Sequence, residues 1–457
     1  MSIMRIHRFE HSRARFAARA LPVLLVAFIG SPNAAAQTRW HVNAMAAPGG
    51  DGLAWGTAFQ SLDDALVLAG IDDEVWVARG VYFPSIEQTP GDPRSATFAV
   101  PPAVSMFGGF DGTETSLDDR AGLFDQTILT GDLGVFGSPY DNAYHVVYVF
   151  YPSGIPPGPV VIDGFTIRDG VGNVAPNRRG GGIYSFNSSL KLARCTITSN
   201  AAWRGGALYA QLGNLKLKWC SLTDNRAGDD GGALWTEIIN VKVANSIFAR
   251  NSAGARGGAV FVRTTADSVP QTPTVLFETC LFHDNYSIRG GAAFLTGNSI
   301  VAGNGSWSNC TFAYNSAESG GAIFAATNVV VPARTYLENC ILWDNLAAQG
   351  PQIQGRVNVS YSIVQSGGHG PTNLALDPLF VNGPARDFRL LPGSPAIDSG
   401  SNPLLHTDYT DVDDNGTAVG QKHPMELGGG RRKLDDPATP NTGVGMGRIV
   451  DRGAYEY

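Results

Sequence analysis

A short phrase recurs at regular intervals between residues 179 and 345: two glycines, a small residue, an aliphatic residue and an aromatic one. The six copies begin at Gly180, Gly205, Gly231, Gly257, Gly290 and Gly320. Five or six residues before the glycines of all but the first copy stands an asparagine: Asn200, Asn225, Asn251, Asn285 and Asn315, with one more at Asn345. Self-similarity at a fixed period indicates a fold of stacked repeats.

The content of the repeat indicates which stacked fold it forms. Each unit holds short apolar runs broken by Gly-Gly and Asn, and it lacks the long helical pattern of helical or leucine-rich repeats. Glycine accepts a positive φ at a corner without steric cost, and asparagine tolerates the left-handed region better than most residues. Coils stacked at the strand spacing of about 4.8 Å would align equivalent positions into ladders. We therefore predict an all-β fold, a right-handed parallel β-helix (solenoid) with a short N-terminal capping helix and an irregular C-terminal cap.

The first 36 residues read as a signal peptide rather than as part of the fold. Residues 20–30 are apolar but too short to span a bilayer, and small residues at 34–36 offer a cleavage site before Gln37. The basic residues that precede the apolar stretch are Arg5, Arg8, Arg13, Arg15 and Arg19. A mitochondrial leader is the less favoured alternative. We expect an exported mature chain without a transmembrane segment, which is secreted or held at the cell surface.

Composition excludes some partners and supports a single domain. Cleavage of the signal peptide would remove five Arg and one Glu and change the net charge from −7 to −11, so we expect no nucleic-acid partner. Hydrophobic residues make up 43% of the chain, enough for a sizeable core, and no CxxC or HExxH metal motif occurs. We expect a monomer.

The mature chain reads as one solenoid with two different ends. We expect residues 37–120 to form the N-terminal cap and first coils, residues 121–368 the β-helix repeats, and residues 369–457 the C-terminal cap. Ser61 and the apolar spacing of residues 62–69 predict the capping helix. Short strands are predicted at residues 75–78, 97–100, 104–107, 127–129, 146–150 and 160–162, with one more coil at 357–364.

The two ends and the repeats together resemble a known family. The phrases Asp-Pro-Leu-Phe (377–380), Ser-Pro-Ala-Ile-Asp-Ser-Gly (394–400) and Gly-Ala-Tyr-Glu-Tyr (453–457) resemble the choice-of-anchor Q region of exported bacterial β-helix proteins. The Gly-Gly-Ala repeats resemble those of polymorphic outer membrane proteins. Trp55, Phe59, Leu62 and the phrase Gly-Gly-Phe-Asp-Gly-Thr-Glu (108–114) resemble the usual front of such proteins. The resemblance covers nearly the whole mature chain and implies a pectin lyase-like β-helix at the cell surface or outer membrane. In that family the tail region usually precedes a surface-sorting signal, and polymorphic outer membrane proteins end in a membrane barrel. Neither feature occurs in this sequence up to Tyr457, so the resemblance gives no support for a covalent anchor.

The position just before each Gly-Gly is mostly basic and is the first candidate site. Stacked at rung spacing, this column would form a ridge able to hold carboxylates or sulfates. The alternative, which we favour, is a solvated corner whose charges neutralise one another. The column consists of Arg179, Arg204, Asp230, Arg256, Arg289 and Ser319. Our candidate ligand-binding residues are Arg204, Asp230, Trp235, Arg256 and Arg289.

The tail offers a candidate metal site. Residues 408–416 alternate oxygen-bearing side chains and end in glycine, the spacing from which Ca²⁺ sites are built. The candidate ligands are Asp408, Asp411, Asp413 and Asn415. The Glu of an EF-hand is absent, so a plain acidic turn is the favoured alternative. A bound calcium ion would staple the C-terminal cap rather than take part in catalysis.

Two further columns are predicted inside or on the coils. The five cysteines share one repeat position and an inward direction, so we predict buried free thiols rather than disulfides.

The aromatic residues of the Gly-Gly phrase alternate with aliphatic ones, and we expect the aliphatic side chains inward and the rings outward as a ladder. Such a ladder is either covered by another segment or open as a platform for sugar rings. The six rings belong to Tyr184, Tyr209, Trp235, Phe261, Phe294 and Phe324.

These features favour a non-catalytic exported β-helix protein that binds glycan or another macromolecule along one lateral face. The alternative is a polysaccharide lyase or hydrolase acting on acidic polysaccharide, because β-helices of that kind carry acids, Arg and Lys on one lateral face. No motif supplies a paired acid and base, so we assign no catalytic residue and expect no turnover of pectate, alginate or chondroitin. Fold alone does not decide between the two.

Overall fold

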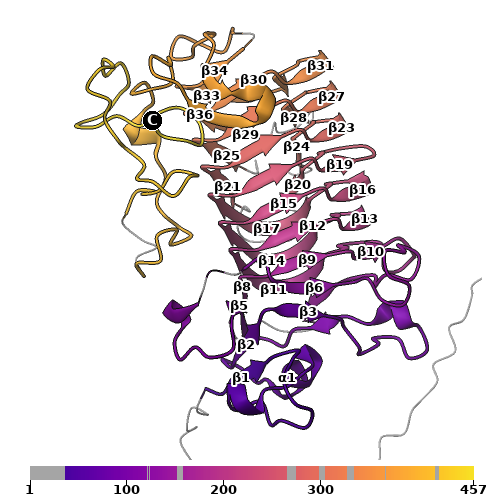
Figure 1. The fold of residues 1–457 in the computed structure, drawn as a ribbon. Helices are drawn as coiled ribbons and strands as arrows, with labels where there is room; N and C mark the ends of the chain where they lie inside the picture. Colours follow the sequence, from indigo (N-terminus) through magenta and orange to yellow (C-terminus); the bar gives the residue numbers. More distant parts are fainter. Residues whose placement is uncertain are drawn as a thin grey trace, which may run out of the picture. The chain divides into compact units, whose positions relative to one another are not determined.

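Three long parallel sheets wind around one core in the computed structural model (Figure 1). The structure describes residues 37–457 apart from 121, 123, 152–157, 265–273, 298–303, 327–333, 366 and 417–420. The proposed signal peptide, residues 1–36, lies outside the described residues. Within the described part the coils form the predicted right-handed parallel β-helix.

The largest sheet has 17 strands, and its long members bend to form two sides of a coil. One end of β11 pairs with β7 and its other end with β8. The strand bends between the two ends at Asn187, whose backbone is in the left-handed region. The strands of this sheet are β1 (Arg39–Val42), β2 (Glu74–Ala78), β4 (Phe98–Ala99), β5 (Ser105–Phe110), β7 (Val147–Phe150), β8 (Val160–Asp163), β11 (Ile183–Ala193), β14 (Leu208–Lys218), β17 (Leu234–Ala244), β20 (Val260–Thr264), β21 (Thr274–Glu278), β24 (Ala293–Gly297), β25 (Asn304–Ser308), β28 (Ile323–Ala325), β29 (Arg334–Glu338), β32 (Ile353–Gly355) and β33 (Val357–Ser360).

The other two sides of the coil are shorter sheets of ten and seven strands. The ten are β3 (Gly80–Tyr82), β6 (Thr127–Thr130), β9 (Thr166–Arg168), β12 (Thr196–Thr198), β15 (Ser221–Thr223), β18 (Ile247–Ala249), β22 (Leu281–His283), β26 (Thr311–Ala313), β30 (Ile341–Trp343) and β34 (Ile363–Val364). The seven are β10 (Val171–Gly172), β13 (Ala201–Arg204), β16 (Arg226–Asp230), β19 (Ser252–Ala253), β23 (Tyr286–Arg289), β27 (Ser316–Ser319) and β31 (Leu346–Gln349). These strands confirm the stacked short strands expected from the sequence.

Glycine and asparagine build two of the corners in different ways. The first glycine of each repeat is left-handed, with φ of +62° at Gly205 and +68° at Gly231, as predicted. The expectation that Asn takes a left-handed corner is wrong for the repeat asparagines, because the residue before each one does so, for example Ser199 and Asp224. The asparagines are instead buried, and each Nδ2 donates to the Oδ1 of the Asn one coil further on, over 2.8–3.1 Å. This internal ladder satisfies amides that face the core.

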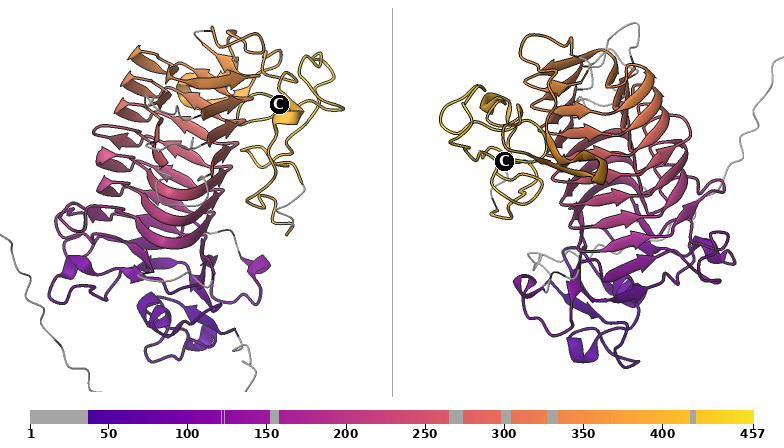
Figure 2. Two further views of the ribbon diagram at one scale, coloured as in Figure 1. Left: turned by 180° about the vertical axis from the view of Figure 1, so that it is seen from behind. Right: turned by 45° about the horizontal axis from the view of Figure 1, so that its top comes forward.

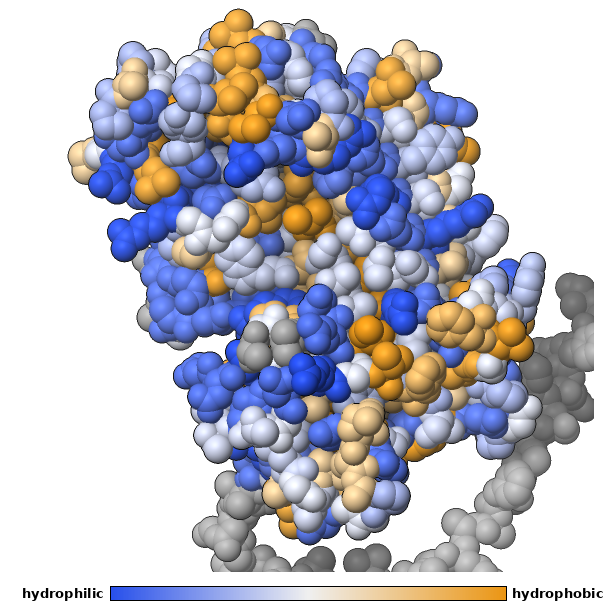
Figure 3. Space-filling model, in the orientation of Figure 1, coloured by the Kyte–Doolittle hydropathy of each residue, from blue (hydrophilic) through white to orange (hydrophobic). Residues whose placement is uncertain are grey.

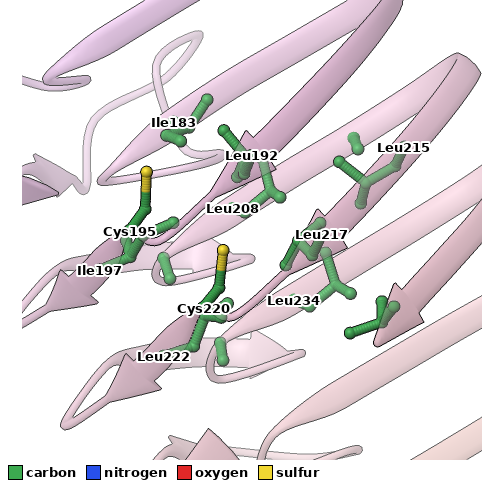
Figure 4. Packing of buried hydrophobic residues seen from close by; sticks show 14 of the residues in the cluster. Ile183, Leu192, Cys195, Ile197, Leu208, Leu215, Leu217, Cys220, Leu222 and Leu234 are labelled. Carbon is green, nitrogen blue, oxygen red and sulfur yellow. The ribbon is translucent and has the colours of Figure 1, made fainter. Parts of the chain in front are cut away.

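The core is a continuous column of aliphatic side chains with the cysteines beside it (Figure 4). Ile183, Leu208 and Leu234 are fully buried in it, so the aliphatic residue of each phrase points inward as predicted. Cys195 and Cys220 occupy equivalent places on consecutive coils, and their sulfur atoms point the same way. All five cysteines are buried free thiols, as predicted, in this structure.

One helix lies at the N-terminal end of the coils, where the sequence predicts a cap. Helix α1 (Leu62–Leu68) begins at Ser61, whose hydroxyl accepts a hydrogen bond from the Asp63 N–H. Its apolar residues Leu62 and Leu66 join the main core. Short 3-10 turns complete the helical segments: η1 (Trp55–Thr57), η2 (Pro93–Ser95), η3 (Leu117–Asp119), η4 (Gly383–Ala385) and η5 (Asn402–Leu404). No helix among the described residues has the length and hydropathy needed to cross a bilayer.

The tail packs along the side of the upper coils (Figures 1 and 2). It contains an antiparallel pair, β35 (Phe380–Asn382) and β36 (Asp387–Leu390). Apolar residues on the outer surface of the ten-stranded sheet pack against it, such as Leu281 against Phe388. The corner residue Asn309 donates through Nδ2 to the carbonyl of Asp451 over 3.0 Å. On the face shown in Figure 3, hydrophobic residues form separated patches among hydrophilic ones.

The phrase at 394–400 contacts Asp451 and Arg452, which directly precede the phrase at 453–457. The backbone N–H of Asp398 donates to Oδ1 of Asp451 over 2.7 Å, and the Arg452 guanidinium donates to the carbonyl of Ser399. Burial raises the pKa of Asp451 to about 7. Residues 394–400 and 451–457 therefore act as one structural unit that holds the tail together.

Candidate functional site

The predicted charged column exists as an in-register ladder on the outside of the coils. Arg179 aligns with Arg204, Arg204 with Asp230, Asp230 with Arg256, and Arg256 with Arg289. The column lies at the end of the seven-stranded sheet, one residue before each left-handed glycine, so the corner geometry fixes its spacing. We call this surface the arginine face.

The middle of the arginine face is neutralised by ion pairs. Arg256 forms two hydrogen bonds of 2.7 Å with the Asp230 carboxylate, which is 1% exposed. Burial raises the pKa of Asp230, and the bond to Arg256 opposes that rise. Arg204 pairs with Asp229 at 2.9 Å. The solvated-corner interpretation therefore describes the middle of the column well.

The two ends of the arginine face differ from its middle. Arg178, Arg179 and Arg289 are exposed, and none forms an ion pair with the residues that the structure describes. Arg178 and Arg179 follow each other directly, so two unpaired guanidinium groups lie at one end. Free charge on this face is concentrated there.

The aromatic residues form a continuous outward ladder next to the arginines, as predicted. Tyr148 extends it by one ring, and consecutive rings are nearly parallel, with centroids 4.5–5.8 Å apart. The four middle rings form a buried cluster separate from the main core, and Tyr184 and Phe324 pack against it. We call the aromatic ladder the seven residues Tyr148, Tyr184, Tyr209, Trp235, Phe261, Phe294 and Phe324.

The middle of the ladder is covered, so it is not an open platform for sugars. Trp235 is 1% exposed, and its two faces stack on Tyr209 and Phe261. Arginines of the neighbouring column lie over the rings, with the Arg256 guanidinium 5.0 Å from the centroid of Phe261. Among the described residues, the contacts of the tail lie on the ten-stranded sheet and on the part of the long strands after the bend, so they do not identify the tail as the segment that covers the ladder. Trp235 therefore stabilises the coil stack, and its buried Nε1 lacks a hydrogen-bond partner.

Two adjacent cavities open along this face and share Arg204. The larger, about 600 Å³, lies at the end with the free arginines. The smaller, about 250 Å³, lies over the ion-paired middle and is lined by Asp230, Trp235 and Arg256 among others. The larger cavity is lined by His145, Tyr148, Ala175, Pro176, Asn177, Arg178, Arg179, Tyr184, Trp203 and Arg204.

The larger cavity combines cations with aromatic surface. Trp203 is 49% exposed, while Tyr148 and Tyr184 are half-buried at the end of the aromatic ladder. His145 is buried beneath them, and its Nδ1 lies 2.9 Å from the carbonyl oxygen of Gly180. Burial lowers the pKa of His145 to about 4, so the imidazole is neutral at physiological pH. The cavity therefore offers fixed positive charge from arginine alone.

Sequence reasoning placed Arg204, Asp230, Trp235 and Arg256 on one face but missed most of this cavity. Trp203 stands next to the predicted column, and the Arg178–Arg179 doublet was a visible signal. Tyr148 and His145 gave no such signal, because their alignment with β11 depends on a register across a long irregular connection. Arg289 lies in the column but does not line either cavity.

The candidate metal ligands of the tail are partly assembled. Asp408, Asp411 and Asp413 each place one carboxylate oxygen within 4.8 Å of the others. Oδ1 of Asp413 is buried without a hydrogen-bond partner, and Asp408 is fully buried with a pKa raised by that burial. Asn415 donates through Nδ2 to Asp413. Clustered hard oxygen donors with one unsatisfied atom fit Ca²⁺.

Comparison with known proteins gives one short match in sequence and several in structure. The family described as the Chlamydia polymorphic membrane protein repeat matches residues 309–326. No curated protein sequence matches the chain.

The solved structures similar to the chain include pectate lyase Pel9A, with a TM-score of 0.49, 14% identity and coverage of 92% of this chain and 96% of that one. A pectin methylesterase mutant in complex with a hexasaccharide has a TM-score of 0.32 and 10% identity, over 75% of this chain and 94% of that one. Activity does not follow from similarities of this degree. By its own architecture and its matching repeat, the chain is a parallel β-helix with a polymorphic membrane protein-like repeat.

Proposed function

We propose that this chain is an exported β-helix protein that binds an acidic polysaccharide along its arginine face without transforming it. The ligand would enter the larger cavity at the free-arginine end and continue along the face toward Arg289. Carboxylate or sulfate groups would pair with the guanidinium groups, which are shaped for two-point contact with such anions.

The observation that carries this proposal is the pair Arg178 and Arg179 in a cavity of about 600 Å³ lined by Trp203 and the end of the aromatic ladder. Cavities of this size accommodate small ligands or a short stretch of a polymer. Exposed guanidinium groups without acidic partners are available for an incoming anion. The exposed indole of Trp203 offers an apolar surface against which a sugar ring can pack.

Binding without turnover agrees with the titratable groups that line the two cavities. Asp230 is held by two hydrogen bonds to Arg256, and His145 is buried with its Nδ1 at the carbonyl of Gly180. The remaining ionisable lining groups are arginines and tyrosines. None of these described groups is a free acid or base near neutral pH, which general acid–base catalysis requires.

Export and a place at the cell surface belong to the same proposal. The basic and apolar start of the sequence supports export, and the match to a polymorphic membrane protein repeat supports surface association. N-terminal sequencing of secreted protein should begin at or within a few residues of Gln37. A mature form that keeps Arg5 to Arg19 would contradict export by this route.

The binding test compares charge variants on immobilised polygalacturonate and on a neutral galactan. Wild-type protein should bind the acidic polymer and not the neutral one, and added salt should weaken binding. The double variant Arg178→Gln/Arg179→Gln should bind about 10- to 100-fold more weakly, the range expected when charge-assisted hydrogen bonds are lost.

The matched control is Arg356→Gln, which removes one exposed positive charge between β32 and β33, outside both cavities. It should bind like wild type. Equal binding by wild type and the double variant would refute the proposal. New ultraviolet absorbance from unsaturated products would show a lyase instead, and release of reducing ends alone a hydrolase.

A further inference from the structure

A second cation-lined cavity lies on another side of the same coils, beneath the tail loop 408–414. It has a volume of about 350 Å³. Its floor is the outer surface of β8, β11 and β14, and its wall is the tail at Thr410, Asp411 and Asp414. The lining is otherwise basic and aliphatic apart from Asp163: Val161, Asp163, Lys191, Leu192, Ala193, Arg194, Lys216, Leu217 and Lys218.

Three lysines run along this surface on consecutive coils. Lys191 aligns with Lys216, and Lys216 with Lys242, in the hydrogen-bonded register of β11, β14 and β17. The ladder ends on apolar residues, Val161 below Lys191 and Leu276 above Lys242. Like charges directly opposite each other on adjacent strands are destabilising. We call these three residues the lysine ladder.

The cations of the cavity differ in how far they are neutralised. Arg194 pairs with Asp163 and Asp414, and Lys218 pairs with Asp414. Lys191 and Lys216 form no ion pair with the residues that the structure describes. Lys216 donates only to the carbonyl of Tyr409, over 2.8 Å.

The remaining acid in the wall is already engaged with the tail. Asp411 accepts a hydrogen bond from the backbone N–H of Gly416. Burial, together with the charges of Lys191 and Lys242, lowers the pKa of Lys216. Lys191 and Lys216 therefore present two ammonium groups without a direct ion-pair partner among the described residues, and the charges of Asp408 and Asp411 offset that of Lys216 only in part.

We propose that this cavity binds one acidic sugar unit of an oligosaccharide, with its carboxylate or sulfate between Lys191 and Lys216. The volume exceeds that of an inorganic anion and lies within the range of roughly 300–1,000 Å³ for small-molecule sites. None of the described lining residues is aromatic, which disfavours a nucleotide, since a base would lack a stacking partner. Hydroxyl groups of the sugar would face Thr410 and the carboxylates of the tail.

The inference takes its ligand class from the proposed function but uses different residues on a different surface. The lysine ladder lies on the far part of the long strands, beyond Asn187 and Leu212, where each strand bends. The arginine face lies before that bend. The two sites can therefore be disabled separately.

The test measures protection of individual amines from acylation, read peptide by peptide in a mass spectrometer. Trigalacturonate should slow the labelling of Lys191 and Lys216 severalfold, with no change at the exposed Lys433. Galactotriose, the neutral counterpart, should protect neither. Sodium sulfate at the same ionic strength should protect much less than trigalacturonate if the whole sugar unit is recognised.

Variants complete the test with calorimetric titration of trigalacturonate. Lys191→Gln and Lys216→Gln should each weaken this site about tenfold, as expected for one charge-assisted contact. Lys433→Gln should leave affinity unchanged. Protection that persists in Arg178→Gln/Arg179→Gln protein would separate this site from the arginine face.

Two outcomes would overturn the inference. Loss of polygalacturonate binding in the arginine variants, with no protection of Lys191 or Lys216 in wild type, would leave the proposed function intact and remove the second site. Equal protection by sulfate and trigalacturonate would show a simple anion site rather than recognition of a sugar.

Discussion

The same three long strands carry two ladders of opposite energetic character. Before the bend, β11, β14 and β17 stack aromatic rings, and after it they stack ammonium groups. The paired positions are Tyr184, Tyr209 and Trp235 at one end, and Lys191, Lys216 and Lys242 at the other. A β-helix stacks equivalent residues whatever their chemistry, so the chemistry decides whether the stack stabilises the fold.

Stacked rings gain contact area and favourable ring geometry, whereas stacked ammonium groups repel each other. The middle of the aromatic ladder is accordingly buried, and arginines lie over it. Lys191 remains exposed beside a cavity, and Tyr409 of the tail loop contacts the ladder's other two members. A ladder that lowers stability needs another reason to be present, and a bound anion would supply one. Four predictions test this contrast.

The largest expected effect is at the centre of the aromatic ladder. Trp235→Ala should lower the free energy of unfolding by about 3–5 kcal/mol, the range for truncation of a core aromatic. The reason is that the ring is 1% exposed and stacked on both faces. Guanidinium-induced unfolding followed by circular dichroism measures it.

Trp203→Ala is the matched control, because Trp203 is 49% exposed whereas Trp235 is 1% exposed. It should cost less than about 1 kcal/mol, as surface substitutions usually do. A small loss at Trp235 would show that the rings contribute little and would remove the energetic contrast between the two ladders.

The second effect concerns acid stability at His145. Its pKa is about 4 in the folded chain, below the ordinary value of 6.5, so the unfolded chain binds the proton more readily. The contribution of neutral His145 to the free energy of unfolding is fully present above pH 6.5, and it is lost as the pH falls toward 4. The loss should reach roughly 3 kcal/mol at pH 4.

His145→Gln should therefore show a smaller decrease in unfolding free energy than wild type between pH 6.5 and 4. Comparing the two proteins cancels the contributions of other titratable groups to the pH dependence. One of these groups is Asp451, whose raised pKa of about 7 stabilises the folded chain as the pH falls. Parallel pH profiles for the two proteins would contradict burial of His145.

The third effect tests calcium at the tail loop that covers the lysine ladder. Millimolar CaCl₂ should raise Tm by a few degrees, because a ligand at 100 times its Kd adds about 2.7 kcal/mol. Asp413→Asn should abolish the rise, since it removes the carboxylate with the unsatisfied Oδ1. MgCl₂ is the control cation, and an unchanged Tm in CaCl₂ would support the plain acidic turn.

The repeat allowed most of the fold to be predicted, because its period and its Gly-Gly corners are local signals. The inward aliphatic residues, the buried thiols and α1 were predicted for the same reason. The role of the repeat asparagines was not, since a side-chain ladder such as Asn200 to Asn225 depends on contacts between coils. The path of the tail along the side of the coils also arises from long-range packing, of Leu281 and Phe388 for example.

The candidate site was predicted less completely. The charged column was found because it repeats, but the cavity at Arg178 and Trp203 lies where the repeat begins and the pattern is irregular. The lysine ladder was missed although it repeats over three coils, because it lies outside the Gly-Gly phrase. Burial of Trp235 could not be read from alternation, which gives the direction of a side chain but not what covers it.

The smallest expected effect distinguishes the two ladders most directly. Lys191→Gln removes one member of a like-charged pair across β11 and β14. It should raise the free energy of unfolding by about 0.2–1 kcal/mol at low ionic strength, the size of a cross-strand pair contribution. The gain should shrink in 0.5 M NaCl, because salt screens charges that are exposed to solvent. Tyr184→Leu at the other end of the same strand should instead lower stability, with little dependence on salt. If Lys191→Gln destabilises the protein without a ligand, the lysines contribute to holding the tail loop, and the cavity beneath it is structural.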